Sequence, residues 1–281
     1  MDRLRKCTPP RDQPIGTVLT NRIAVTKDRN VVLWVDEQKF LTVPFPTSWQ
    51  EAERFLFGST PGAESALVGS WLSPDAGVVI PQPWPEQDAV VAWLRSGEWP
   101  VVRLVCGTSG QGKTFLAHQV CRIMQAEGWS TGFMKKPPLS WQLLSLADLT
   151  TGKNAARLNR ALIRVPEIIA AIHAIPAVGG QWLLVVDHAE NTDLIVRELL
   201  ETINDADVTD RVWVLLLART TGDWWRELSE EHYLCNLIDP TPLQLSSLTE
   251  HMPPQQVEWV WREAVAAFVA RARQVHYQSG L

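Results

Sequence analysis

Residues 107–114 read Gly-Thr-Ser-Gly-Gln-Gly-Lys-Thr and match the pattern G-x-x-x-x-G-K-[ST]. A β-rich run at 101–106 (VVRLVC) precedes this stretch, and a helical pattern at 115–124 follows it. Glycines let backbone N–H groups approach an anion, and the next helix points its N-terminus at the same anion. This strand–loop–helix order therefore predicts a phosphate-binding P-loop, against the alternative of an ordinary glycine-rich turn with an exposed lysine.

Every position of this loop is a candidate for binding a nucleotide. We expect the side chain of Lys113 to reach the β- and γ-phosphates and the hydroxyl of Thr114 to bind Mg²⁺. The predicted nucleotide-binding residues are Gly107, Thr108, Ser109, Gly110, Gln111, Gly112, Lys113 and Thr114.

Two further apolar runs end in charged residues, WLLVVD at 182–187 and RVWVLLLAR at 211–219. Helical patterns separate these runs, and strands that alternate with helices predict a parallel sheet covered on both faces. Ligands bind at the carboxyl ends of such strands. We therefore expect Asp187 and Arg219 to converge with the P-loop on one site.

Each of these polar residues has a functional interpretation and a structural alternative. Asp187 is predicted to hold Mg²⁺, although it could only cap a helix. Glu190 is predicted to orient or deprotonate the attacking water, although the first turn of a helix also favours an acid. Arg219 is predicted to contact the γ-phosphate, although it could be a surface arginine. His188 is interpreted as a packing or hydrogen-bonding residue.

Composition limits the classes of function. The chain has 281 residues, 46% of them apolar, with a net charge of −5 and a pI near 5.7. A substantial core can form, and a broad nucleic-acid-binding face is not expected. The cysteines form no C-x-x-C pair, which favours reduced thiols in a cytoplasmic protein and no metal site of their own. The apolar run at 212–218 is too short to cross a bilayer, so no membrane association is expected.

The chain is predicted to divide into a small α+β region at 1–80, of unknown role, and a P-loop NTPase domain at 81–281. Residues 22–44 have the pattern of a β meander, and Ser48 with Glu51 forms a capping box that begins a helix. The predicted fold is α/β, a three-layer P-loop NTPase sandwich with a parallel sheet. Helical material is expected at 139–175, broken near residues 150–153 and at Pro166.

Four stretches together resemble the ATPase core of the STAND class of P-loop NTPases, in the bacterial form related to NACHT and NB-ARC regulators. The stretches are VRLVCGTSGQGKTFLA at 102–117, GWSTGF at 128–133, WLLVVDHAE at 182–190 and VWVLLLARTTGDWWREL at 212–228. The resemblance implies ATP and ADP as nucleotides, slow Mg²⁺-dependent hydrolysis, and a signalling switch that oligomerises with ATP. It also implies the roles given above for Lys113, Thr114, Asp187 and Arg219, and it places an acid at Glu190.

The sequence departs from that family at His188, where an acidic or aromatic residue is more usual. It also shows no repeat period typical of a solenoid sensor. A protein partner or separate sensor subunit, or a shortened relative of the family, is therefore expected. Two alternatives stay open: a P-loop kinase for a small molecule, and an ATP-binding scaffold protein that never hydrolyses its nucleotide. No arginine-rich lid follows Arg219, which weighs against the kinase.

Overall fold

The computed structural model describes residues 22–35, 38–57, 85–134 and 155–246, with scattered positions between 254 and 269. The chain divides into two compact units. The first comprises residues 1–58, 133–181 and 192–212, and the second comprises 59–132, 182–191 and 213–281. The predicted domain boundary between residues 80 and 81 lies outside the described residues and stays a prediction.

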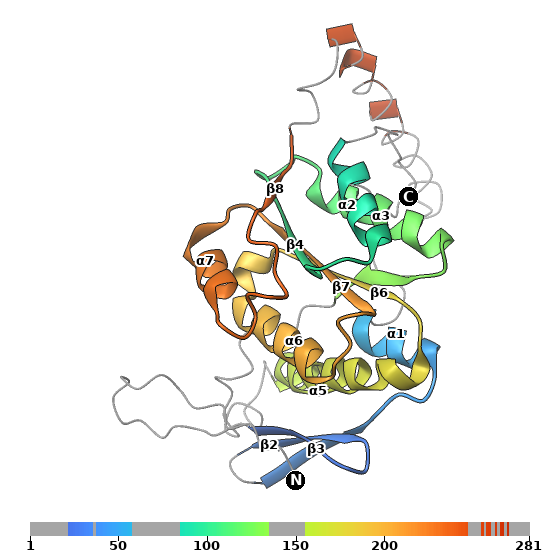
Figure 1. Ribbon diagram of the computed structural model, residues 1–281, viewed down its shortest axis with the longest axis vertical. Helices are drawn as coiled ribbons and strands as arrows, with labels where there is room; N and C mark the ends of the chain where they lie inside the picture. The colour runs from blue at the N-terminus through green and yellow to red at the C-terminus, as the bar shows by residue number, and fades with distance from the viewer. Residues whose placement is uncertain are drawn as a thin grey trace, which may run out of the picture. The chain divides into compact units, whose positions relative to one another are not determined.

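A five-stranded sheet forms the centre of the second unit (Figure 1). Its strand order is β5-β6-β7-β4-β8, and β4 pairs in parallel with both β7 and β8. The strands are β4 (Val102–Cys106), β5 (Ser130–Phe133), β6 (Trp182–Asp187), β7 (Val212–Ala218) and β8 (Leu243–Gln244). The P-loop strand β4 and the aspartate strand β6 are thus separated by β7.

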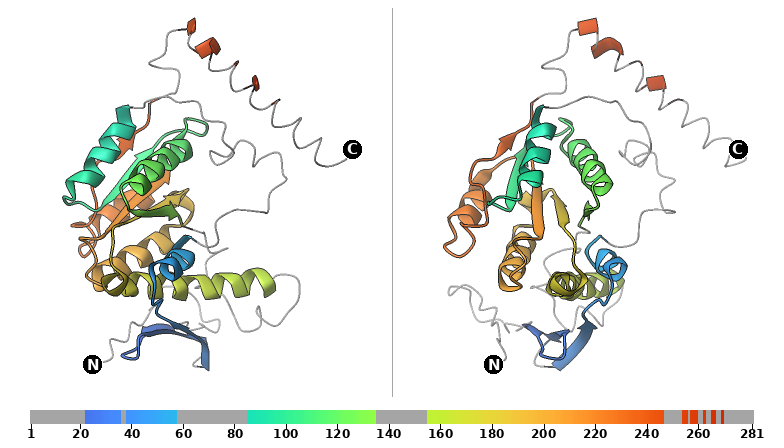
Figure 2. Two further views of the ribbon diagram at one scale, coloured as in Figure 1. Left: turned by 90° about the vertical axis from the view of Figure 1, so that its right-hand side faces the viewer. Right: turned by 45° about the vertical axis from the view of Figure 1, so that its right-hand side comes forward.

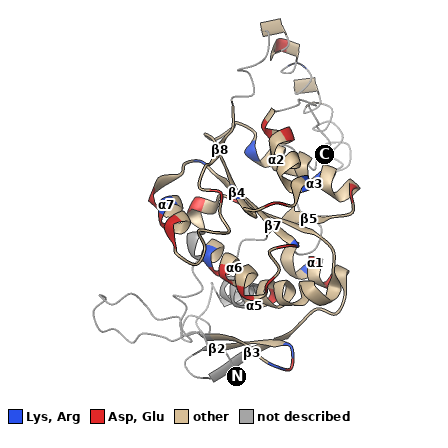
Figure 3. Ribbon diagram, viewed as in Figure 1, with Lys and Arg blue, Asp and Glu red and all other residues tan. Residues whose placement is uncertain are grey.

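Uninterrupted apolar runs explain the interior strands of this sheet. Every residue of β7 is buried, and the strand carries no charged residue (Figure 3). In β6, the residues from Trp182 to Val186 are buried and only Asp187 is partly exposed. Continuous burial of this kind is typical of parallel strands that are covered on both faces.

Helices α2 (Pro85–Ser96) and α3 (Lys113–Ala126) pack against each other in the same unit, as both views in Figure 2 show. Each helix buries one apolar stripe, and proline occupies the first position of α2, where its missing N–H is not needed. The short helix η5 (Ala189–Asn191) follows β6, and α7 (Gly222–Glu230) follows β7.

The described part of the first unit contains an antiparallel sheet in the order β1-β2-β3 and three helices. Half of the predicted capping box is present at its first helix, because the Ser48 hydroxyl accepts the Glu51 N–H at 3.2 Å. The Glu51 carboxylate accepts the Thr47 N–H at 3.0 Å in place of the Ser48 N–H. The elements are β1 (Arg22–Val25), β2 (Asn30–Val35), β3 (Gln38–Pro44), α1 (Trp49–Phe57), α5 (Ala155–Val178) and α6 (Asp193–Asp205).

The expected helix break at Pro166 is wrong. Helix α5 continues through Pro166 and Pro176, although each proline lacks the N–H that the helix interior uses. The turns after Pro166 bury Ile168, Ile169 and Ile172 almost completely, and this packing offsets the missing hydrogen bond. The predicted helical material at 139–154 lies outside the described residues.

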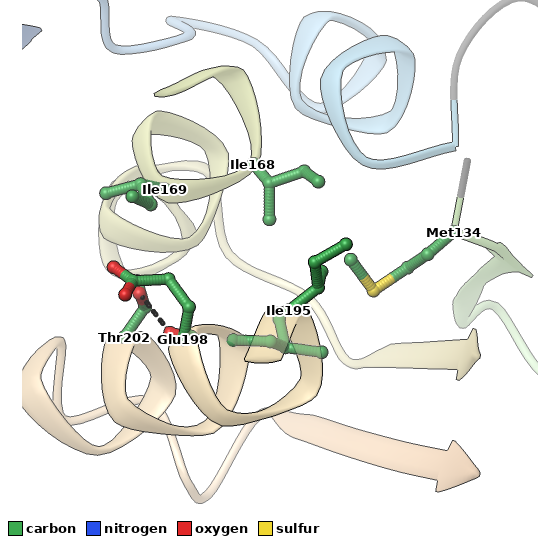
Figure 4. Close-up of a pocket in the computed structure, with 7 residues that line it drawn as sticks. Met134, Ile168, Ile169, Ile195, Glu198 and Thr202 are labelled. Carbon is green, nitrogen blue, oxygen red and sulfur yellow. Dashed lines mark hydrogen bonds between the residues drawn. The ribbon is translucent and has the colours of Figure 1, made fainter. Parts of the chain in front are cut away.

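A small apolar space lies between α5 and α6 in the first unit (Figure 4). On its polar side, the Thr202 hydroxyl donates to the backbone carbonyl of Glu198 at 2.7 Å. The lining residues are Met134, Ile168, Ile169, Ile195, Glu198, Leu199 and Thr202.

The predicted fold class is confirmed as an α/β P-loop NTPase fold with a parallel sheet, preceded in the sequence by a small α+β region. Among the residues that the structure describes, every helix lacks the length or the apolar character that crossing a bilayer requires.

Candidate nucleotide site

The P-loop joins the end of β4 to the start of α3 within the second unit. The Gly107 N–H donates to the Ala218 carbonyl of β7 at 3.2 Å, which ties the first residue of the loop to the neighbouring strand. Gly110 and Gly112 have φ angles of 85° and 90°, a region that glycine adopts without steric cost. No described side chain caps the first turn of α3, so its N-terminal N–H groups are available to an anion.

The ammonium of Lys113 is folded back over the loop. Its Nζ donates to the Gly107 carbonyl at 2.5 Å and to the Thr108 carbonyl at 2.9 Å. Burial lowers the pKa of Lys113, the carboxylates of Asp187 and Glu190 oppose that shift, and the Arg219 guanidinium adds to it. Two carboxylates and one guanidinium therefore influence the Lys113 ammonium.

The two residues predicted to bind Mg²⁺ also lie together. The Thr114 hydroxyl is 3.4 Å from Asp187 Oδ2, while the other oxygen, Oδ1, accepts the His188 N–H at 2.9 Å. One hydroxyl and one carboxylate are hard oxygen ligands, as Mg²⁺ requires. The described part of the chain holds no cluster of three or more His, Cys, Asp or Glu residues for a metal, so phosphate oxygens and waters would supply the remaining ligands.

Glu190 and Arg219 meet at the ends of η5 and β7. The Arg219 N–H donates to Glu190 Oε1 at 3.4 Å, a long hydrogen bond. The second oxygen, Oε2, is buried and has no hydrogen-bond partner among the described residues. Because β7 lies between β4 and β6, Arg219 leaves the sheet between the P-loop and Asp187.

Two neighbours of the loop, Cys106 and Leu245, were not predicted to belong to the site, and the contact that Gln111 makes inside the predicted loop was not expected either. The Gln111 side chain covers Gly107, because a Cβ at Gly107 would lie 2.4 Å from Gln111 Oε1. The Leu245 N–H donates to the Cys106 carbonyl at 2.7 Å, directly after β8. Burial raises the pKa of the Cys106 thiol to about 11, with Glu190 adding to the shift. Only the β-rich context of Cys106 could have been read from the sequence.

The structure therefore brings together every predicted site residue: the P-loop, Asp187, Glu190 and Arg219. His188 lies among them, with its ring nitrogens within 4 Å of two carboxylates. Their chemical roles stay predictions. The fold and this strand–loop–helix arrangement define a P-loop NTPase.

Comparison with known proteins gives no family model and no curated protein that matches this chain. Among solved structures, the Aeropyrum pernix ORC1 protein in complex with DNA is similar, with 17% identity over 73% of this chain and 55% of that one, at a TM-score of 0.45. Cdc6p from Pyrobaculum aerophilum is 12% identical over 69% of this chain and 53% of that chain, at a TM-score of 0.43. The Aeropyrum pernix ORC2 protein in ADPNP–ADP complexes has 14% identity over 68% and 55%, also at 0.43.

The chain thus spans about half the length of these solved structures. At such TM-scores and identities the likeness does not extend to function, and it does not separate the STAND class from other P-loop NTPases. One of the similar proteins was solved in complex with DNA. The expectation that nucleic acid is an unlikely partner of this chain stays a prediction.

Proposed function

We propose that this protein is an ATP-binding nucleotide switch of the STAND type, with slow Mg²⁺-dependent ATP hydrolysis, acting in signalling or regulated assembly. The observation that carries the proposal is the 3.4 Å contact between the Thr114 hydroxyl and Asp187 Oδ2 beside a complete P-loop. A P-loop alone indicates phosphate binding. A second strand-end carboxylate within reach of its threonine adds a place for the metal that accompanies a nucleoside triphosphate.

Nucleotide binding would have to rearrange the loop. Lys113 is held by the carbonyls of Gly107 and Thr108, and it must leave them to contact the β- and γ-phosphates. Bound Mg²⁺ would neutralise part of the phosphate charge, with Thr114 and Asp187 as its protein ligands. Loss of the γ-phosphate would remove a partner of Lys113 and of Arg219, and this difference is what a switch needs between its ATP and ADP states.

Slow turnover agrees with the way Glu190 is held. Its single hydrogen bond to a described residue is long, and a general base works best when its orientation is fixed. The proposal includes a cytoplasmic location, which the free thiols of Cys106, Cys121 and Cys235 favour. It also includes a nucleotide-dependent homo-oligomer and a protein partner or sensor subunit that supplies the signal.

The molar mass in solution tests the switch. We expect light scattering to show a larger assembly with Mg²⁺ and a non-hydrolysable ATP analogue than with Mg²⁺ and ADP. The matched control is Lys113→Ala, which should show no difference between the two nucleotides. An unchanged mass with both nucleotides would contradict the switch.

Turnover measurements separate the alternatives. ADP release that depends on an added small-molecule acceptor would replace the switch with a P-loop kinase. Tight ATP binding with no turnover would indicate a scaffold protein that uses ATP only for its structure.

A further inference from the structure

His188 occupies an unusual place in the site. It follows Asp187 directly and has a φ of 53°, a left-handed conformation that is uncommon outside glycine. Its N–H donates to Asp187 Oδ1 at 2.9 Å, and its carbonyl accepts the Asn191 N–H at 3.0 Å, which closes the turn of η5. The backbone of His188 therefore orients the Asp187 carboxylate and forms the turn that carries Glu190.

The imidazole of His188 lies between the two carboxylates of the site. Its Nε2 is 3.8 Å from Asp187 Oδ2, and its Nδ1 is 3.9 Å from Glu190 Oε1. Both distances exceed a hydrogen bond. Hydrogen bonds around a catalytic group are often long without substrate and shorten in the complex, so a small rotation of Glu190 would complete one of them.

The two carboxylates differ in how well they are held. Asp187 already accepts the His188 N–H and lies beside the Thr114 hydroxyl. Glu190 has one long bond to the Arg219 N–H, and its Oε2 is buried with no hydrogen-bond partner in the described part of the chain. A neutral imidazole has only one N–H to donate. Glu190 is the less firmly held of the two carboxylates, because its Oε1 accepts one long hydrogen bond and its Oε2 accepts none among the described residues. The imidazole N–H would therefore contribute most at Nδ1, the nitrogen that lies near Glu190 Oε1.

We propose that His188 is a positioning residue for Glu190, with its Nδ1–H donated to Glu190 Oε1 when nucleotide is bound. The inference rests on the proposed hydrolysis and names the group that orients its base. The proposal assigns His188 no contact with phosphate or with the attacking water. It acts by limiting the directions in which Glu190 can accept a proton.

Two substitutions separate the imidazole from the backbone of His188. Glycine and asparagine both accept a left-handed φ, so His188→Gly and His188→Asn should keep the turn. The amide nitrogen of asparagine can take the place of Nδ1, whereas glycine offers no donor. We expect His188→Gly to lower kcat about 10- to 100-fold with little change in KM, the usual size for loss of such a supporting contact. His188→Asn should retain kcat within about threefold of the wild type.

The experiment measures ATP turnover at saturating Mg²⁺, ATP affinity by calorimetry and the thermal midpoint of both variants. Equal turnover in His188→Gly and the wild type would overturn the inference and leave the proposed function intact. An equal loss in both variants would also overturn it, because the effect would then not depend on a hydrogen-bond donor in the side chain at this position. A wild-type protein that binds ATP without turning it over would remove the proposed hydrolysis and this inference together.

Discussion

Replacing Gly107 by alanine tests how the first residue of the P-loop is packed. A new Cβ would lie 2.4 Å from Gln111 Oε1 and 3.3 Å from Leu245 Cβ, where ordinary contact begins near 3.4 Å. The Gln111 amide must therefore retreat by about 1 Å. It is the end of a flexible side chain, and its Oε1 has no hydrogen bond to lose among the described residues. Gly107 is not left-handed, so alanine adds no backbone strain there.

The two main effects of Gly107→Ala on the free energy of unfolding nearly cancel. Forcing Gln111 off its preferred rotamer costs about 0.5–1.5 kcal/mol. Alanine restricts the unfolded chain and recovers about 0.4–1 kcal/mol. We therefore expect Gly107→Ala to lower the free energy of unfolding by less than about 1 kcal/mol. Gly110→Ala meets no atom within 4 Å, but its φ of 85° should cost an alanine about 1–2 kcal/mol.

Urea denaturation without nucleotide, followed by tryptophan fluorescence, measures both losses. Gly110→Ala should be the less stable variant, although it creates no clash. Adding Gln111→Ala should relieve Gly107→Ala, because it removes the atom that the new Cβ meets. The reasoning fails if Gly107→Ala loses more than about 2 kcal/mol and the second substitution recovers none of it.

Three further predictions concern the chemistry of the site. Lys113→Ala should weaken ATP binding about 100-fold or more in calorimetry, since charge-assisted contacts are worth roughly 1.5–3 kcal/mol each. Its control is the same substitution at the exposed Lys27. Glu190→Gln should bind ATP normally but lower single-turnover phosphate release about 100- to 10,000-fold, and normal release would exclude Glu190 as the base. Cys106, with a pKa raised by burial to about 11, should resist alkylation at pH 8 while the half-buried Cys235 reacts, as peptide mass mapping would show. Folding raises this Cys106 pKa, so its contribution to stability is present below about pH 9 and is lost as the pH rises towards about 11.

The interior of the sheet could be predicted because its strands are continuous apolar runs. The run at 182–187 coincides with β6, and β7 lies within the predicted run at 211–219. The convergence of Asp187 and Arg219 with the P-loop followed from the rule that parallel strands end at one edge of a sheet.

Other features left no periodic signal. Strand β8 has two residues, Leu243 and Gln244, and it follows a proline, so neither its length nor its composition resembles a strand. It forms because β4 offers unpaired backbone groups along that edge. The continuation of α5 through Pro166 was missed for a different reason. Proline strongly predicts the end of a helix, but burial of the following turns outweighs that preference here. The left-handed backbone conformation of His188 could not be predicted from the sequence, because histidine usually adopts right-handed helical or extended conformations.

The position of β7 between β4 and β6 sets a length scale for the site. Neighbouring strands lie about 4.8 Å apart, so the two strands that carry the P-loop and Asp187 are roughly 9–10 Å apart. The side chains of Thr114 and Asp187 close that gap to 3.4 Å. The width of one buried strand thus fixes how far a side chain at position 187 must reach. The additional methylene group in Asp187→Glu would move the carboxylate about 1.5 Å too far, much more than the ~0.2 Å by which metal–ligand distances vary. In the proposed metal site, the spacing of the sheet would decide which carboxylate can share Mg²⁺ with the P-loop threonine.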